Sequence, residues 1–286
     1  MTRIVYINNK YLDEKNAKIS IFDRGLLFAD AVYEVTAVIN GKLIDFSNHV
    51  MRLNRSLKEL NINHKFKEEY LLKIHKNLIK KNSLNKKEAL IYLQVSRGTM
   101  ERDFIIPKKK LKINLFAFTQ EKKLTHFNNN GLKILSINDL RWNRRDIKTT
   151  QLIFASLSKT KAINEGYDDA WMIEDDGYVN EGTSNNAYII DKNNTIITRE
   201  LSSKLLAGVT RNTILEVAEK LKLTIEERPF TITEALEANE AFISSASNLI
   251  LPVISINKNK IGNGEMGPIT EILRETYIKV SLKNSV

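Results

Sequence analysis

The amino-acid sequence predicts an α+β protein of two domains. Its 286 residues suit one large domain or two of ordinary size, and 42% of them are hydrophobic, which is near the globular norm. Strand and helix patterns mix along the chain, and hairpin signals at Asn40-Gly41 and Asp175-Asp176-Gly177 favour antiparallel strands over a doubly wound parallel sheet. A polar linker over residues 121–131 is expected to separate a small domain, residues 1–120, from a large domain, residues 132–286.

In the first domain, alternating apolar residues predict strands, and apolar residues at helical spacing predict helices. The hairpin at Asn40-Gly41 carries the strongest signal, because β-branched residues alternate on both sides of it. Ser47 is expected to cap the helix that follows. The predicted strands cover residues 3–7, 17–21, 31–39, 42–45, 89–96 and 110–119, and the predicted helices cover residues 47–60 and 68–80.

The second domain shows the same mixture of elements. Gly166 is expected to end one helix, and Pro268 is expected to lie in the first turn of the last one. The predicted strands cover residues 132–137, 186–190 and 241–244 together with a pair around 175–177, and the predicted helices cover residues 150–164, 210–221 and the stretch from 268 onward.

The residue types that are missing exclude several kinds of chemistry. Cysteine is absent, which excludes disulfides, thiolate zinc sites, iron–sulfur clusters and cysteine nucleophiles. The four histidines lack metal-site spacing, so no metal is expected. The N-terminal residues carry scattered charges instead of a signal-peptide core, and no stretch approaches the ~18 apolar residues of a membrane span. We expect a cytoplasmic protein without a membrane partner.

The formal net charge of +10 raises the question of nucleic-acid binding. The short lysine runs are scattered along the chain and intermixed with glutamate and asparagine, whereas a nucleic-acid-binding face concentrates its cations. Such runs are typical of solvated surfaces, and no nucleic-acid partner is expected. A basic nucleic-acid-binding protein without catalysis remains a remote alternative.

Motifs narrow the chemistry further. The sequence has no G-x-S-x-G elbow, P-loop or G-x-G-x-x-G motif, so lysine, carboxylates and tyrosine remain, together with an organic cofactor. Lys148 lies in a cation-rich segment, residues 141–150, between a predicted strand and a predicted helix. Neighbouring positive charge and burial both disfavour an ammonium and favour a nucleophilic amine. An ordinary surface lysine would fit the same local pattern.

Two further segments supply a carboxylate and anion sites. Glu181 ends a predicted strand before a Gly/Thr/Ser/Asn turn, residues 182–186, whose backbone N–H groups can face an anion. Gly208 opens a helix, and a helix N-terminus is a second place for an anion. Each segment alone fits an ordinary turn. A lysine, a carboxylate and a phosphate cradle are nevertheless the parts that a pyridoxal-phosphate site requires.

Seven short segments form a set that is specific in its order and spacing, namely residues 23–35, 49–53, 97–99, 145–148, 181–186, 208–211 and 242–247. Together they resemble the class IV, or fold type IV, pyridoxal-phosphate aminotransferases, and most of all the D-amino-acid (D-alanine) aminotransferases. The resemblance covers nearly the whole chain. It implies a homodimer with a small N-terminal and a larger C-terminal α+β domain and with pyridoxal 5′-phosphate at the domain interface. It also implies transfer of an amino group from an amino acid to a 2-oxo acid.

The resemblance implies roles for single residues. Lys148 would hold the cofactor as a Schiff base and move the proton between substrate Cα and the cofactor, with Tyr33 beside it as a hydrogen-bond donor. Glu181 would pair with the pyridine nitrogen, and Leu206 would press on one ring face. Arg52 would bind the phosphate through two parallel hydrogen bonds. The implied cofactor and phosphate contacts are Ser184, Asn185, Gly208, Val209, Thr210, Ser245 and Ala246, with Arg141 in the surrounding polar network. The turn through Ser247 would complete the cradle, and Ser247 would contact the substrate together with Tyr33 and Arg102.

Departures from the family pattern concern the substrate. D-selective enzymes bind the α-carboxylate with an Arg-x-His pair on a loop of the partner subunit, whereas this chain has Arg102-Asp103-Phe104. The lost donor is worth about 1.5–3 kcal/mol unless something replaces it. Branched-chain enzymes anchor the carboxylate at the turn that corresponds to Ser245, Ala246 and Ser247, and Ala246 replaces a threonine common there. We expect a D-amino acid such as D-alanine, bound by Arg102. A branched-chain L-amino-acid aminotransferase and an aminodeoxychorismate-type lyase are the alternatives.

Overall fold

The computed structural model describes residues 2–127 and 131–286, which form two compact units. Unit 1 comprises Met1–Leu124, Ile147–Gln151 and Asn284–Val286, and unit 2 comprises Thr125–Asp146 and Leu152–Lys283. Residues 147–151, including Lys148, therefore group with the N-terminal part of the chain, although they lie beyond the predicted linker. Residues 128–130 of that linker lie outside the described residues. No described helix is long and apolar enough to cross a bilayer.

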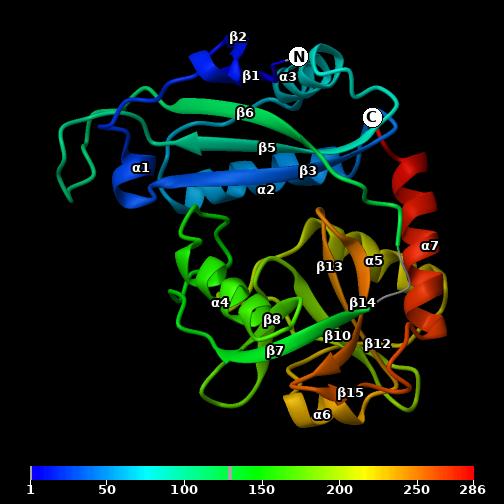
Figure 1. The fold of residues 1–286 in the computed structure, drawn as a ribbon. Coiled ribbons are helices and arrows are strands. Elements are labelled where there is room, and N and C mark those ends of the chain that lie inside the picture. The colour runs from blue at the N-terminus through cyan, green and yellow to red at the C-terminus, as the bar shows by residue number, and fades with distance from the viewer. Residues whose placement is uncertain (1, 128–130) are drawn as a thin grey trace. The chain divides into compact units, whose positions relative to one another are not determined.

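Unit 1 is built on a six-stranded antiparallel sheet in the order β2-β1-β6-β5-β3-β4 (Figure 1). The strands are β1 (Ile4–Ile7), β2 (Lys10–Asp13), β3 (Ala31–Ile39), β4 (Lys42–Leu43), β5 (Glu88–Ser96) and β6 (Asn114–Glu121). The helices are α1 (Arg24–Phe28), α2 (Phe46–Glu59) and α3 (Glu68–Lys81), and a short 3₁₀ helix spans Glu14–Asn16.

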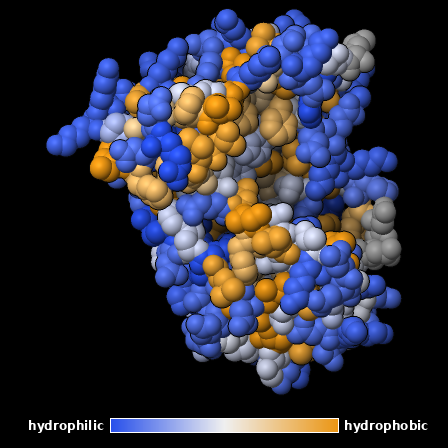
Figure 2. Space-filling model, turned by 60° about the vertical axis from the view of Figure 1, so that its left-hand side comes forward, coloured by the Kyte–Doolittle hydropathy of each residue, from blue (hydrophilic) through white to orange (hydrophobic). Residues whose placement is uncertain are grey.

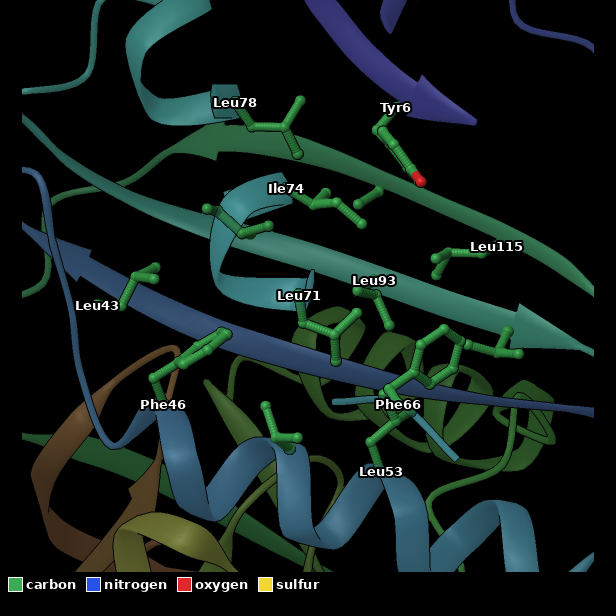
Figure 3. Packing of buried hydrophobic residues seen from close by; sticks show 14 of the residues in the cluster. Tyr6, Leu43, Phe46, Leu53, Phe66, Leu71, Ile74, Leu78, Leu93 and Leu115 are labelled. Carbon is green, nitrogen blue, oxygen red and sulfur yellow. The ribbon is translucent and has the colours of Figure 1, made fainter. Parts of the chain in front are cut away.

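The core of unit 1 lies between one face of this sheet and the helices α2 and α3 (Figure 3). Every second residue of β5 points into it, as with Ile91 and Leu93, because successive side chains of a strand face opposite sides. Leu53 and Leu57 of α2 are buried there at helical spacing. The opposite face of the sheet therefore remains available for other contacts, and Tyr33 lies on that face, half-buried.

The hairpin predicted at Asn40-Gly41 is confirmed. Both turn residues have positive φ, 51° and 76°, as a type I′ turn between twisted strands requires. A Cβ added at Gly41 would approach the carbonyl oxygen of Asn85 to 2.6 Å, so glycine is needed at this position for space as well as for φ.

Two predictions for unit 1 are wrong. Residues 17–21 form no strand, and Ile21 is 70% exposed; the edge strand is β2 instead, which lacks a strong apolar pattern. Ser47 does not cap α2, because the helix begins one residue earlier and Asp45 is the N-cap, without a side-chain cap bond. The Ser47 hydroxyl donates to Glu68 at the start of α3.

Unit 2 contains a nine-stranded mixed sheet in the order β12-β11-β10-β13-β14-β7-β8-β9, with β15 paired to β14. Parallel pairs, such as β7 with β8, occur among antiparallel ones. The strands are β7 (Leu132–Asn138), β8 (Asp169–Ile173), β9 (Val179–Gly182), β10 (Asn186–Ile190), β11 (Ile196–Thr198), β12 (Ile225–Glu227), β13 (Glu240–Ser245), β14 (Leu249–Ile256) and β15 (Asn259–Lys260). The helices are α4 (Ile153–Asn164), α5 (Val209–Lys220), α6 (Ile232–Glu237) and α7 (Pro268–Lys283).

The α+β fold class is confirmed, and so are all the helices and strands predicted for unit 2 to within a few residues. Gly166 follows α4 with a φ of +84°, and α7 begins at Pro268. The prediction missed β11, β12, β14, β15 and α6. Trp171 of β8 and Phe230 are completely buried and pack edge to face at 5.8 Å in the core of this unit.

Candidate active site

Lys148 is held in unit 1 by backbone contacts. The backbone N–H of Tyr33 donates to the carbonyl of Lys148 over 3.0 Å, and the N–H of Lys148 donates to Ser56 Oγ over 3.4 Å. The lysine side chain lies on the Tyr33 ring, with Nζ 4.2 Å from the ring centroid. Within the part of the chain that the structure describes, Nζ forms no hydrogen bond or ion pair. Such an amine is well placed to attack a carbonyl carbon.

The arginines that precede Lys148 in the sequence do not supply the uncompensated positive charge that the sequence suggested. Each of them is ion-paired with a carboxylate in unit 2, so its charge is largely neutralised. The pairs are Arg141 with Asp139 and Glu181, Arg144 with Asp146, and Arg145 with Glu174. The position of Lys148 on Tyr33, rather than a cationic neighbourhood, is thus its distinguishing feature.

Arg52 of α2 is oriented by a buried carboxylate, Glu34 of β3. Arg52 Nε and Nη2 donate to the two Glu34 oxygens, each over 2.8 Å, and His49 Nδ1 lies 2.7 Å from Glu34 Oε2. Burial raises the pKa of Glu34, but the charges and hydrogen bonds of Arg52 and His49 outweigh it and hold the pKa at about 2. The Nε edge of Arg52 is therefore committed to Glu34.

Replacing Glu34 with glutamine is expected to destabilise unit 1 in a pH-dependent way. Breaking a buried pair leaves Arg52 without its anion and should lower the free energy of unfolding at pH 7 by about 3 kcal/mol. Because the folded-state pKa, about 2, lies below the ordinary value of 4.5, this stabilisation is complete above pH 4.5 and is lost as the pH falls toward 2. In urea unfolding, the free energies of unfolding of Glu34→Gln and the wild type should therefore differ by about 1 kcal/mol less at pH 3.5 than at pH 7.

The matched control for this prediction is Glu14→Gln. The ion pair of Glu14 with Arg3 is more than 40% exposed on both sides, so its loss should cost little at any pH. A stability difference for Glu34→Gln that stays constant from pH 7 to pH 3.5 would contradict the assignment of an ionised, paired Glu34.

Glu181, near the end of β9, is the centre of a buried polar network in unit 2. Its Oε1 accepts from Arg141 Nη1 over 2.7 Å, and its Oε2 accepts from the backbone N–H of Leu206 over 3.1 Å and from Asn186 Nδ2 over 3.4 Å. Arg141 is fixed in turn by Asp139, which accepts from its Nε and Nη2 over 2.9 and 2.7 Å. Glu181 is only 5% exposed, so its position is set by these partners.

The charge of Glu181 is balanced between opposing effects. Burial raises its pKa above the ordinary value, and the neighbouring Asp139 adds to this rise. The Arg141 guanidinium and the Leu206 N–H act in the opposite direction and favour the ionised form. A buried carboxylate with one cationic partner can bind a second cationic N–H, such as a protonated ring nitrogen, because such a bond is charge-assisted.

Two chain turns of unit 2 offer donors for a phosphate. The helix α5 begins after Gly208, so the first backbone N–H groups, at Val209 and Thr210, have no partner within the helix. A Cβ on Gly208 would lie 2.1 Å from Asn186 Oδ1, so only glycine permits this close approach. Between β13 and β14, the hydroxyls of Ser245 and Ser247 lie 3.2 Å apart. This donor set suits a phosphate group.

Two side chains of the turn after β9 form hydrogen bonds within unit 2. Asn185 Nδ2 donates to Asp169 Oδ2 over 2.8 Å, and Thr183 Oγ1 donates to Asp169 Oδ1 over 2.5 Å. These two side chains therefore bind the buried Asp169, and only the backbone of Asn185 remains for an anion. Ser184 is exposed at the tip of the turn.

The structure groups the predicted site residues into two sets, each described within its own unit. Unit 1 holds Tyr33, Arg52, Arg102 and Lys148, whereas unit 2 holds Arg141, Glu181, Ser184, Asn185, Leu206, Gly208, Val209, Thr210, Ser245, Ala246 and Ser247. Arg102 lies on the exposed loop between β5 and β6, with its Cζ 5.5 Å from the ring centroid of Phe28 and 5.3 Å from that of Phe104.

Sequence reasoning gave no role to Glu34, His49 or Asp139. Glu34 directly follows Tyr33. Because side chains alternate along a strand, Glu34 faces the helix that carries Arg52, α2. Asp139 stands two residues before Arg141, so the spacing could have indicated the pair. Among residues 2–127 and 131–286, no cluster of His, Asp and Glu side chains has the arrangement of a metal site.

The chain is similar to proteins of known activity over its whole length. A family model described as amino-transferase class IV matches residues 31–256. The D-alanine aminotransferase of Staphylococcus aureus (strain MSSA476) is 32% identical over 285 residues, covering 99% of each chain. The D-alanine aminotransferase of Bacillus licheniformis is 33% identical over 287 residues, covering 99% of this chain and 96% of its own.

Solved structures share the fold at lower identity. The branched-chain amino acid aminotransferase of Escherichia coli superposes with a TM-score of 0.89 at 20% identity, covering 98% of this chain and 95% of its own. The branched-chain aminotransferase of the archaeon Thermoproteus uzoniensis, solved with norvaline, gives a TM-score of 0.87 at 23% identity, covering 99% of this chain and 96% of its own. At these identities the likeness concerns the fold alone.

Proposed function

This chain belongs to the class IV aminotransferase family and is a pyridoxal-phosphate-dependent transaminase, and on that premise we propose that it moves the amino group of a D-amino acid, such as D-alanine, to a 2-oxo acid. The observation that carries the proposal is the Lys148 amine, which lies 4.2 Å from the Tyr33 ring centroid and has no ion pair or hydrogen bond among the described residues. It is suited to form the covalent link to the cofactor aldehyde.

The residues described above fit pyridoxal phosphate. When bound, the cofactor supplies a protonated pyridine ring that accepts the electrons of the substrate Cα–H bond. We propose that Glu181 accepts a hydrogen bond from the pyridine nitrogen, with Arg141 and the Leu206 N–H holding its carboxylate in place. The Lys148 amine then moves the proton at substrate Cα, and the Tyr33 ring orients that amine.

The phosphate of the cofactor would be bound by the donors of two turns and one arginine. We propose that the N-terminus of α5, at Gly208, and the hydroxyls of Ser245 and Ser247 face it. Arg52, oriented by Glu34, would add a charge-assisted contact. Ala246 contributes a backbone N–H where a threonine would add a hydroxyl. Leu206 is proposed to pack on the ring, and the turn at Ser184 and Asn185 to contribute backbone groups.

Sequence similarity supports a preference for D-amino acids. The curated relatives at 32–33% identity are D-alanine aminotransferases, whereas the two branched-chain enzymes match at 20% and 23%. Arg102 is the proposed anchor of the substrate carboxylate, and its guanidinium has no ion pair among the described residues. The competing anchor at Ser245–Ser247 would favour a branched-chain L-amino acid.

Steady-state assays of the holoenzyme with 2-oxoglutarate as acceptor test this proposal. D-alanine should react faster than L-leucine, and turnover should require the 2-oxo acid. Faster turnover of L-leucine would move the assignment to the branched-chain enzymes. Turnover without an acceptor would favour a lyase of the aminodeoxychorismate type.

We also propose a homodimer, because unit 1 exposes apolar side chains that a second copy would cover. Ile21 and Leu26 are 70% and 68% exposed, and Phe22 is 42% exposed. Figure 2 shows apolar side chains at the surface of the molecule, and contiguous exposed apolar surface is typical of interaction sites.

Sedimentation velocity should give the mass of two chains. Leu26→Asp should shift the measured mass toward that of one chain, whereas Ile272→Asp on α7 should not.

The cytoplasmic location remains a prediction from the sequence.

A further inference from the structure

Three arginines lie around the loop between β5 and β6, and one of them differs from the others. Arg24 and Arg97 are both buried and both bind Asp30, with Nε to Oδ2 distances of 2.7 and 2.6 Å. Arg102 is exposed, and its guanidinium has no carboxylate partner in the described part of the chain. Asp30 is thus paired with Arg24 and Arg97, and the N–H groups of Arg102 can bind an anion from solution.

Arg102 is nevertheless not a loose side chain, because two aromatic rings contact it. Its Cζ lies 5.5 Å from the Phe28 centroid and 5.3 Å from the Phe104 centroid, within the range of cation–π contacts. The two rings contact each other edge to face, 5.4 Å apart at 66°. We name Phe28, Arg102 and Phe104 the aromatic clamp.

The aromatic clamp is connected to the buried part of unit 1 through Arg24. The Arg24 guanidinium lies 4.6 Å from the Phe28 centroid, and its Nη1 donates to the carbonyl of Asp103 over 2.7 Å. Asp103 lies between Arg102 and Phe104 in the sequence. The same buried arginine therefore fixes one ring and the backbone of the loop that carries the other.

A cation–π contact attracts the guanidinium charge to the rings without pairing it with an anion. The contact thus positions the group while its guanidinium forms no hydrogen bond or ion pair among the described residues. A carboxylate is the planar partner that matches two guanidinium N–H donors. The Phe104 ring offers no hydrogen-bond donor of its own, so Arg102 is the donor that this pair presents to an anion.

We propose that Phe28 and Phe104 are positioning residues that hold Arg102 for the substrate α-carboxylate, so that an amino acid is anchored through one oriented guanidinium. This inference rests on the proposed function, because it assigns the carboxylate of that reaction to Arg102. It adds the residues that orient the anchor and gives Phe104 a specificity role.

The experiment compares Phe104→Leu with Phe104→Tyr in the holoenzyme. Leucine keeps an apolar side chain but lacks a π face, whereas tyrosine keeps the face. Propionate is the probe, titrated by the change in cofactor absorbance, alongside KM and kcat for D-alanine. Phe104→Leu should raise the Kd of propionate and the KM of D-alanine about 2- to 5-fold at unchanged kcat. Phe104→Tyr should match the wild type, and so should Ile105→Ala, which alters a neighbouring, 72% exposed side chain.

Repeating the measurement in the Arg102→Ala variant shows whether Phe104 affects carboxylate binding through Arg102. If the ring acts through Arg102, Phe104→Leu should have no further effect once Arg102 is gone. Wild-type affinity in Phe104→Leu, an equal loss with and without Arg102, or failure of propionate to bind the wild type would each overturn the inference. If propionate shows the expected coupling but D-alanine is not transaminated, the proposed function fails while the carboxylate anchor stands.

Discussion

Replacing Lys148 with alanine is expected to abolish transamination and leave the fold intact. The variant loses both the covalent link to the cofactor and the base that moves the Cα proton, so kcat should fall by roughly 10³-fold or more. The fold should tolerate the change because Lys148 Nζ forms no ion pair or hydrogen bond in the described residues. Its backbone contacts with Tyr33 and Ser56 do not depend on the side chain.

The measurement combines activity with chemical mapping. After borohydride reduction, the cofactor of the wild type should be found on the peptide that contains Lys148, and Lys148→Ala should carry no covalent cofactor. The control is Lys192→Ala, which removes an exposed lysine from the loop between β10 and β11 and should behave like the wild type. Normal turnover by Lys148→Ala, or a label on another lysine, would refute the site.

Replacing Glu181 with glutamine is expected to give the second-largest loss. The variant should still bind the cofactor, but the ring nitrogen loses its anionic partner and removal of the Cα proton should slow by about 10- to 100-fold. Arg141 keeps its contacts with Asp139, so the network that surrounds the residue should remain folded. Because the proton step becomes slower, the kinetic isotope effect with Cα-deuterated D-alanine should increase.

The matched control is Glu226→Gln. Glu226 is about half exposed and paired with Arg228, so its loss should change neither the rate nor the isotope effect. An unchanged isotope effect together with an unchanged rate in Glu181→Gln would contradict the role of the carboxylate at the ring nitrogen.

The fold was predictable where local rules decide the structure. The Asn40-Gly41 hairpin needs two residues with positive φ, and the apolar spacing of α2 matches its buried face. The failures have tertiary causes. β14 contains Pro252 opposite Phe242 and shows no regular alternation, so the sequence did not indicate an interior strand. Residues 17–21 alternate like a strand but leave Ile21 exposed.

For the site, motifs indicated the residues but not their partners. Lys148, Glu181 and Arg52 were found by resemblance, and each has surroundings that the sequence did not reveal. The Glu34–Arg52 pair joins β3 to α2, and the Arg141–Glu181 pair joins segments 40 residues apart. Such long-range contacts depend on sheet register and on loop paths, which local patterns do not specify. The aromatic clamp likewise joins α1 to a loop more than 70 residues away in sequence.

A single half-reaction distinguishes a D-selective aminotransferase from the alternatives. The holoenzyme is mixed with D-alanine in the absence of any 2-oxo acid, and the pyruvate released is counted per protomer. One equivalent of pyruvate is expected, because the amino group then remains on the enzyme until an acceptor arrives. The reaction with L-leucine should be much slower. Absence of pyruvate, repeated turnover without an acceptor, or a faster reaction of L-leucine would contradict a D-selective aminotransferase.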